Sequence, residues 1–377
     1  MTGAELKAQA RAQLGGGIFK NEWLTALAVC FIAMAICSAA GGLLSGIGAL
    51  ILSGPMTYGV AYVFLKQSRD GQPMNVADVF RGFPEDFGGT LLLALKLLGR
   101  ELGELRIYDP NAAQCRRYEL ELNQVLPVSD GQPMPRVTIC PEERLFDCDV
   151  FLFTASRGVP PLGSEVKDVR MAQYAANREM LRQYAKKARE AGFRGLFCQI
   201  SDPVDHLARA VFLYSNQDET GAYDFAGLLP EQIQGFGLGV MAARAAYMAE
   251  KTGLDFTNGR VYGPHGAGLI AANDYGAGYD AEASERLTQQ TREANLRVRE
   301  LGFKPYIAPG LSSAAISVLR MLRGETYYSA LPLGGCYFGC RSRWTPCGQQ
   351  LLREAVCPAL FDRLKQTHTA LKEFRYV

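Results

Sequence analysis

The side chain best suited to proton transfer in this 377-residue sequence is His265, one of only three histidines. It lies in the segment Gly263-Pro-His265-Gly266, directly after the β-type residues Val261 and Tyr262. An imidazole exchanges protons near neutral pH, and glycines beside it would let a substrate approach closely. A lone histidine between glycines is more often structural, so its interpretation depends on the residues that surround it.

Two arginines upstream of this histidine are suited to binding or polarising an anion. Arg170 follows a loop rich in Gly and Pro at residues 157–163, and Arg244 lies in an alanine-rich helical pattern. A guanidinium pairs with a carboxylate through two hydrogen bonds, and Gly/Pro-rich loops often close over bound molecules. For either arginine alone, a surface ion pair is the simpler interpretation.

The stretch that ends at Asp109 has the pattern of the second half of a βαβ nucleotide-binding unit. A helical pattern at residues 91–98 leads into the β-type run 104–108, and Asp109 then stands where a carboxylate accepts hydrogen bonds from the ribose of NAD. Only the last glycine of a G-x-G-x-x-G fingerprint can be placed, at Gly89, and the apolar strand before it is absent. Its loss is expected to leave sheet edges unpaired and to remove the pyrophosphate site.

Apolar runs predict the elements that position these residues. Buried strands are expected at Cys148–Thr154 and Gly195–Ile200, the second ending in Ser201-Asp202-Pro-Val-Asp205, with a long helix beginning near Arg170 between them. Further along, the patterns predict a charged helix at 280–301, β-type runs within 331–344 and a terminal helix at 349–371.

Composition excludes several classes of protein. The formal net charge is +2, from 40 basic and 38 acidic residues, which argues against a nucleic-acid partner bound through bulk charge. The ten cysteines are scattered, which suits reduced thiols. Their one cluster, Cys336, Cys340 and Cys347, fits no common zinc spacing, so no metal is expected.

The N-terminal part carries no Asp, Glu, Lys or Arg between Leu24 and Leu65. Its two apolar runs, 24–40 and 49–65, each approach the ~20 residues that a membrane-spanning helix needs. They predict a transmembrane hairpin in a lipid bilayer, and a buried helix pair or a signal peptide is the alternative. Basic residues before and after the runs predict that both ends, and hence the rest of the chain, lie on the cytoplasmic side of the cell membrane.

Residues 4–87 resemble a family of small bacterial integral membrane proteins of unknown function. The resemblance rests on Leu6-Lys-x-x-Ala-x-x-x-Leu14, Gly54-Pro-Met-x-x-Gly59 and Val76-Ala-Asp-Val-Phe80. It implies no activity.

From about Gly88 to the C-terminus the chain resembles the lactate/malate dehydrogenase family. The residues that carry the resemblance are, in chain order, Asp109, Thr154, Arg170 with Asn177, Asp202-Pro-Val-Asp205, Arg244, Gly263-Pro-His265-Gly266 and Gly310-Leu-Ser-Ser313. It implies an α/β fold with an incomplete Rossmann-type NAD domain at 88–230 and an α+β catalytic domain at 231–377. With the membrane hairpin predicted at 1–87, the chain is expected to have three parts. A homo-oligomer is compatible with this family.

The resemblance also implies roles for these residues. His265 would exchange a proton with the oxygen of a small 2-hydroxy or 2-keto acid as hydride passes to or from NAD. Arg244 would bind the substrate carboxylate, and Arg170 would polarise the carbonyl after loop closure. Gly89, Asp109, Thr154 and Asp202 would contact the cofactor. Ser312 and Ser313 would contact the substrate.

Two positions depart from the family pattern. Family members carry an Asp three residues before the carboxylate-binding Arg, where it orients the histidine, and this chain has Met241 there. Asp202 replaces the Asn of an N-P-V-D motif and is a candidate for the missing negative charge.

Three functions remain open from the sequence. The chain is an NAD-dependent 2-hydroxyacid dehydrogenase, an inert chimaera of a membrane-protein fragment and a truncated dehydrogenase, or a tethered module that binds a carboxylate without turnover. The substrate itself is not predicted.

Overall fold

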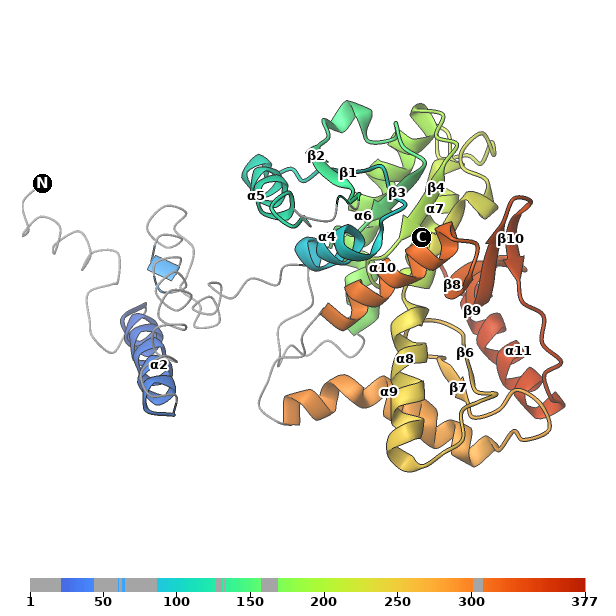
Figure 1. Cartoon of the computed structure of the whole chain (residues 1–377). Helices are drawn as coiled ribbons and strands as arrows, with labels where there is room; N and C mark the ends of the chain where they lie inside the picture. Colours follow the sequence, from blue (N-terminus) through green and yellow to red (C-terminus); the bar gives the residue numbers. More distant parts are fainter. Residues whose placement is uncertain are drawn as a thin grey trace, which may run out of the picture. The chain divides into compact units, whose positions relative to one another are not determined.

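The computed structural model describes residues 22–43, 60, 63–64, 87–126, 131, 133–156, 169–300 and 308–376. The chain divides into two compact units, Met1–Asp86 and Phe87–Val377 (Figure 1).

The first unit contains the helix α2 (Glu22–Leu43), blue in Figure 1. Ala26 and Val29 of this helix are buried against Val63. Within the described ranges no helix combines the length and the apolar character needed to cross a bilayer, so the expected membrane hairpin has no support. Its second run, 49–65, lies almost wholly outside the described residues.

The second unit is built on parallel strands followed by antiparallel ones (Figure 1). The parallel strands are β1 (Glu104–Ile107), β2 (Arg136–Ile139), β3 (Val150–Phe153), β4 (Leu196–Gln199) and β5 (Ile233–Gly235). The antiparallel strands of the same unit are β8 (Thr326–Leu333), β9 (Cys336–Thr345) and β10 (Gly348–Leu351). A separate antiparallel pair is formed by β6 (Arg260–Tyr262) and β7 (Ile270–Ala272).

The parallel strands are divided between two sheets. β1 pairs with β2 alone, whereas β3 is the edge of a six-stranded sheet with the order β10-β9-β8-β5-β4-β3. In a doubly wound sheet the first strand lies between these two groups and pairs with both. No described residue pairs with the second edge of β1 or β3, as expected for a sheet that lacks its central strand.

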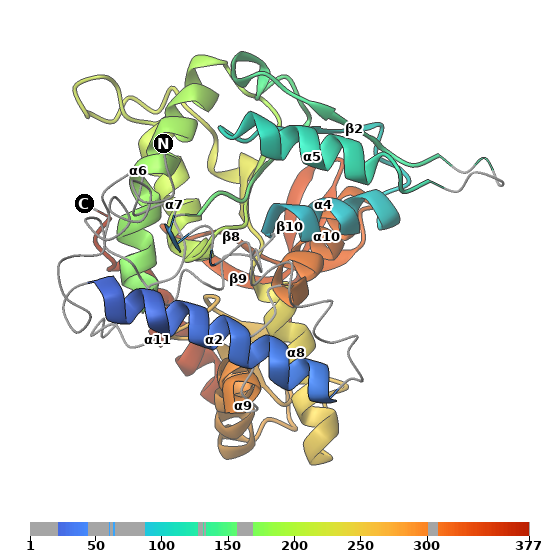
Figure 2. The same cartoon turned by 90° about the vertical axis from the view of Figure 1, so that its left-hand side faces the viewer.

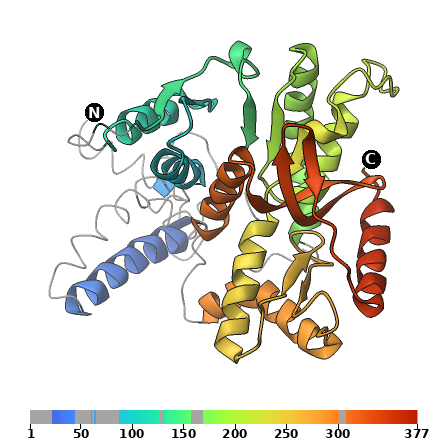
Figure 3. The same ribbon diagram turned by 45° about the vertical axis from the view of Figure 1, so that its right-hand side comes forward.

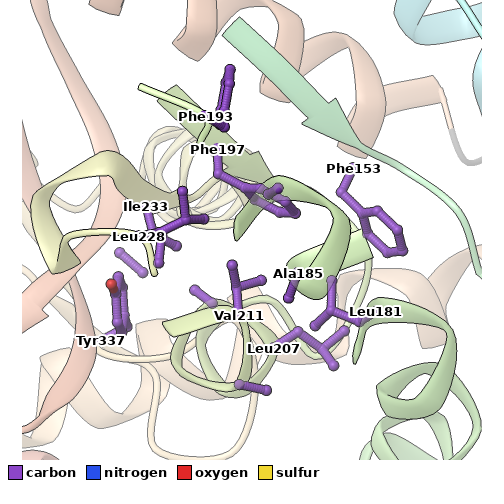
Figure 4. Packing of buried hydrophobic residues seen from close by; sticks show 14 of the residues in the cluster. Phe153, Leu181, Ala185, Phe193, Phe197, Leu207, Val211, Leu228, Ile233 and Tyr337 are labelled. Atoms are coloured by element: carbon purple, nitrogen blue, oxygen red, sulfur yellow. The ribbon is translucent and has the colours of Figure 1, made fainter. Parts of the chain in front are cut away.

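The described helices of the second unit are α4 (Phe87–Leu98), α5 (Ala112–Leu122), α6 (Val169–Glu190), α7 (Val204–Ser215), α8 (Leu238–Thr252), α9 (Ala281–Glu300), α10 (Ala308–Leu322) and α11 (Pro358–Lys372). The two faces of the six-stranded sheet are covered by α6 and α7 and by α4 and α10, whereas α5 packs on β2 and α9 packs on β7. On one face, side chains of β3 and β4 pack against α6 and α7. Figure 4 shows Phe153 and Phe197 close to Leu181, Leu207 and Val211 in this cluster.

On the other face, α4 and α10 lie side by side (Figures 1 and 2). Leu95 of α4 and Leu319 of α10 are each 1% exposed and pack with Cys198 of β4. Leu105 of β1 and Leu152 of β3 border this same cluster. Side-chain packing therefore joins the two sheets where strand pairing does not.

The helices predicted at 91–98 and 280–301 and the β-type runs within 331–344 are confirmed. The two predicted strands are confirmed as β3 and β4, of which β4 is largely buried, whereas in β3 only Phe153 is buried. The prediction of a terminal helix from residue 349 is wrong in its first part. Residues 349–351 form β10, which pairs antiparallel with β9, and α11 (red in Figure 3) begins only at Pro358. Proline is favoured in the first turn of a helix, which accounts for the start of α11 at Pro358.

An ion cluster around Glu354 anchors β6, the strand that leads to His265. The Glu354 carboxylate accepts hydrogen bonds from Arg260 Nε (2.5 Å), Arg341 Nη1 (2.8 Å) and the Tyr262 hydroxyl (2.7 Å). Burial alone would raise the pKa of the Glu354 carboxyl, but the bonds from Arg260 and Tyr262 outweigh burial and hold this pKa below its usual value.

Replacing Leu95 by Ala in the full chain should lower the free energy of unfolding by about 2–5 kcal/mol, because the cavity would open between both sheets. Leu97→Ala on the same helix is the control, since Leu97 is 43% exposed and should cost within about 0.5 kcal/mol. Urea unfolding measures both. Equal losses would contradict the packing of α4 against the strands.

Glu354→Gln should destabilise the fold by about 3 kcal/mol at pH 7, because two half-buried arginines lose their counter-charge. The pKa of Glu354 is lower in the folded state than in the unfolded state. The stabilisation is therefore complete above the unfolded pKa and is lost as pH falls through the folded pKa. The difference between wild type and variant, measured by urea unfolding, should shrink in acid. A pH-independent difference would refute this origin, and Glu282→Gln, in a surface pair with Arg286, is the control.

Candidate functional site

The imidazole of His265 is held by a carboxylate. Its Nδ1 lies 2.8 Å from Oδ1 of Asp202, and its backbone N–H donates to Oδ2 of Asp205 at 2.8 Å. Both aspartates follow β4, at the carboxyl end of the parallel strands, where ligands bind in open α/β sheets. Because an ionised carboxylate only accepts hydrogen bonds, it requires a proton on Nδ1 and leaves Nε2 free for chemistry.

Asp202 is itself fixed by the ends of neighbouring elements. The fully buried Asn177 of α6 donates to the Asp202 carbonyl at 2.9 Å and to the Ser156 hydroxyl at 3.3 Å. The hydroxyl of Ser201 donates to the carbonyl of Ala155 at 2.7 Å. These bonds tie the segment after β3 to the segment after β4, so the position of Asp202 follows from the sheet.

Glycines let α8 approach the histidine and α10. A Cβ added to Gly237, just before α8, would lie 3.0 Å from Cβ of His265. A Cβ on Gly239 would lie 3.0 Å from the hydroxyl oxygen of Ser313, on α10. Ser313, a predicted substrate residue, and His265 therefore both lie against the N-terminal end of α8. Ser312, the other predicted substrate residue, is also on α10 and is half-buried.

Arg244 is placed further along α8. Its Nη2 donates to Oδ1 of Asn295 on α9 at 3.0 Å, and its Nη1 lies 3.9 Å from Sδ of Met241. Met241 is 2% exposed and packs in an apolar cluster with Leu238 and Leu287. The position that carries an Asp in the family pattern is thus part of the hydrophobic core.

The other predicted residues lie at the expected strand ends and helix starts. Gly89 is in the first turn of α4, and Thr154 directly follows β3. Asp109 lies beyond the end of β1, is exposed and accepts a hydrogen bond from the backbone N–H of Asn111 at 2.7 Å. Arg170 is the second residue of α6, and the loop at 157–168 lies outside the described residues.

Sequence reasoning placed Asp202 on the cofactor side and also named it as a candidate for the missing negative charge. It missed two residues that support the histidine and its strand. Glu354 is 94 positions from Arg260, and Asp205 was noted only as part of a motif. Asp205 lies three residues after Asp202, as the second residue of α7, and no local pattern in the sequence signals that it binds the backbone of His265.

Comparisons with known proteins concern the sequence and the fold. No protein-family model matches the chain. L-lactate dehydrogenases from Streptococcus pneumoniae strains, R6 and D39 among them, are 28% identical over 188 residues, which cover 48% of this chain and 49% of the relatives. The chain thus matches about half the length of these curated relatives.

Solved structures share the fold of the second unit. A lactate dehydrogenase from a Medee basin deep-sea metagenome has a TM-score of 0.59 at 16% identity and covers 76% of this chain and 94% of its own. The malate dehydrogenase of Archaeoglobus fulgidus, in complex with NADH, has a TM-score of 0.58 at 14% identity, with 76% and 94% covered. The lactate dehydrogenase of Eimeria maxima, with NADH and oxamate, has a TM-score of 0.59 at 19% identity, with 76% and 89% covered. The chain therefore has the α/β fold of the lactate and malate dehydrogenases, and its sequence relatives support the same family resemblance.

Proposed function

We propose that residues 87–377 transfer hydride between NAD and a small 2-hydroxy or 2-keto acid. The observation that carries this proposal is the His265 imidazole, bonded through Nδ1 to a carboxylate at the carboxyl end of the parallel strands. An imidazole held in this way presents Nε2 as a proton donor or acceptor. The relatives named as L-lactate dehydrogenases and the NADH-bound structures of the same fold support the proposal.

Asp109 and Thr154 would hold NAD, which supplies the hydride acceptor or donor when bound. The exposed carboxylate of Asp109, beyond a parallel strand, suits the two hydroxyls of a ribose. Gly89, in the first turn of α4, would let a phosphate approach the helix N-terminus. The residues directly before α4 lie outside the described ranges.

On the substrate side, His265 would give the Nε2 proton to the keto oxygen during reduction and accept the hydroxyl proton during oxidation. Arg244 would exchange its hydrogen bond with Asn295 for a two-pronged pair with the substrate carboxylate. Ser313, beside the start of α8, would line the same space. Arg170, the second residue of α6, would polarise the substrate carbonyl.

Two observations favour a second function. Among the described residues no strand pairs with the outer edge of β1 or β3, where the strand before the phosphate loop would pair, and Met241 removes a carboxylate from α8. Both features fit an inert chimaera that retains the fold without binding the cofactor.

His265→Ala should lower the rate of NADH oxidation with a 2-keto acid by about 10²- to 10⁴-fold, because the proton donor is removed. The affinity for NADH should not change. His368→Ala is the control, since His368 is a half-buried residue of α11 that contacts the Leu333 carbonyl. Steady-state kinetics on the full chain measure the rates, and equal rates in His265→Ala and wild type would remove the proton-transfer role.

Full-length protein should bind NADH with micromolar affinity in a fluorescence titration, and Asp109→Ala should weaken binding about 10-fold through loss of charge-assisted hydrogen bonds. Asp147→Ala, in an exposed pair with Arg144, should leave binding unchanged. Thermal unfolding confirms that each variant is folded. Absence of NADH binding by wild type would favour the inert chimaera.

A further inference from the structure

We propose that Asp202 is the positioning residue for His265 and takes over the role of the carboxylate that is missing at Met241. The catalytic consequence rests on the proposed dehydrogenase function, but the hydrogen bond can be tested without it. The family resemblance assigns no such role to this position, where it expects an Asn.

Two aspartates hold different parts of the histidine. Asp205, 5% exposed, receives the backbone N–H and so fixes the main chain, whereas Asp202 receives the ring N–H at Nδ1. The His265 side chain is 15% exposed and that of Asp202 is 35% exposed. Of the described acidic side chains, these are the two recorded within hydrogen-bond distance of His265, and only Asp202 contacts the ring.

The position on α8 does not supply a charge. Met241 is 2% exposed among Leu238, Val240 and Leu287, and its thioether is at most a weak acceptor. A carboxylate there would be buried in an apolar cluster at a high desolvation cost. The segment after β4 supplies the carboxylate instead, and Asn177 holds its backbone in place from α6.

The proton transfers of the proposed reaction still balance when Asp202 replaces the acid that the family pattern has at position 241. In the oxidative direction the substrate hydroxyl proton would move to Nε2, and NAD, when bound, would supply the hydride acceptor. The ring would become an imidazolium whose Nδ1 proton stays in the bond to Asp202, and the Asp202 carboxylate would remain ionised. Its charge stabilises the imidazolium, as an orienting aspartate does in hydrolase triads.

Replacing Asp202 would remove the group that fixes the tautomer of the His265 ring. The carboxylate of Asp202 can only accept, so it holds the proton on Nδ1. An amide at this position can donate to Nδ1 or accept from it, and an alanine can do neither. Asp202→Asn and Asp202→Ala should therefore both shift the neutral ring toward the Nε2–H form, which cannot accept the substrate proton.

The first test is nitrogen-15 NMR of histidine-labelled full-length protein. With three histidines in the chain, His206→Gln and His368→Gln variants assign the signals. Wild type should show a protonated Nδ1 and a bare Nε2 for neutral His265, and both Asp202 variants should lose this pattern. Asp205→Asn is the matched control on the same segment and should keep it, because Asp205 contacts the backbone N–H of His265 and not the ring. An unchanged His265 pattern in Asp202→Asn and Asp202→Ala would overturn the proposal.

The second test is kinetic. Asp202→Asn should lower kcat for keto-acid reduction by about 10²- to 10⁴-fold and leave KM and NADH affinity nearly unchanged. If Asp202→Asn retains kcat while His265→Ala loses it, Asp202 does not position the histidine and the proposed function survives. If wild type is inactive but the tautomer shifts as expected, the positioning role survives and the proposed function fails.

Discussion

Apolar side chains between α4, α10 and the parallel strands are the constraint on which this fold depends. Backbone pairing stops at β1 on one side and at β3 on the other, so no hydrogen-bonded ladder among the described residues connects the two sheets. Leu95 fills the space that borders both, with Leu105 and Leu152 at its margin. Because β3 and β4 carry the site at their carboxyl ends, the geometry of the site rests on this packing.

Much of the fold could be predicted because its signals are local. Continuous apolar runs identified β3 and β4, and the helical period identified α4 and α9. The error at the C-terminus has a local cause as well, since residues 349–351 pair with β9 across a tight turn that a helical pattern conceals. The expected boundary near residue 230 remains a prediction, and the six-stranded sheet continues across it from β4 to β5 and β8.

The site was harder to predict because its contacts are distant in the chain. His265 and Asp202 are 63 positions apart, and Asn177 and Asp202 are 25 apart. The residue types alone indicated proton transfer, but the partner of the imidazole depends on where strand ends meet. The substitution at Met241 was visible in the sequence, whereas its burial in the core was not.

The separation of Asp202 from α8 has a consequence for how this site can change. In the family pattern one helix carries both the acid that orients the histidine and the arginine that binds the substrate anion. In this chain α8 carries only the second of these two residues, Arg244. The acid that contacts the histidine ring is Asp202, in the segment after β4. Under the proposed function, substitutions around Arg244 that adapt α8 to a larger or differently charged acid would leave the acid that holds the imidazole unchanged. Substrate preference and proton transfer would then be separately evolvable.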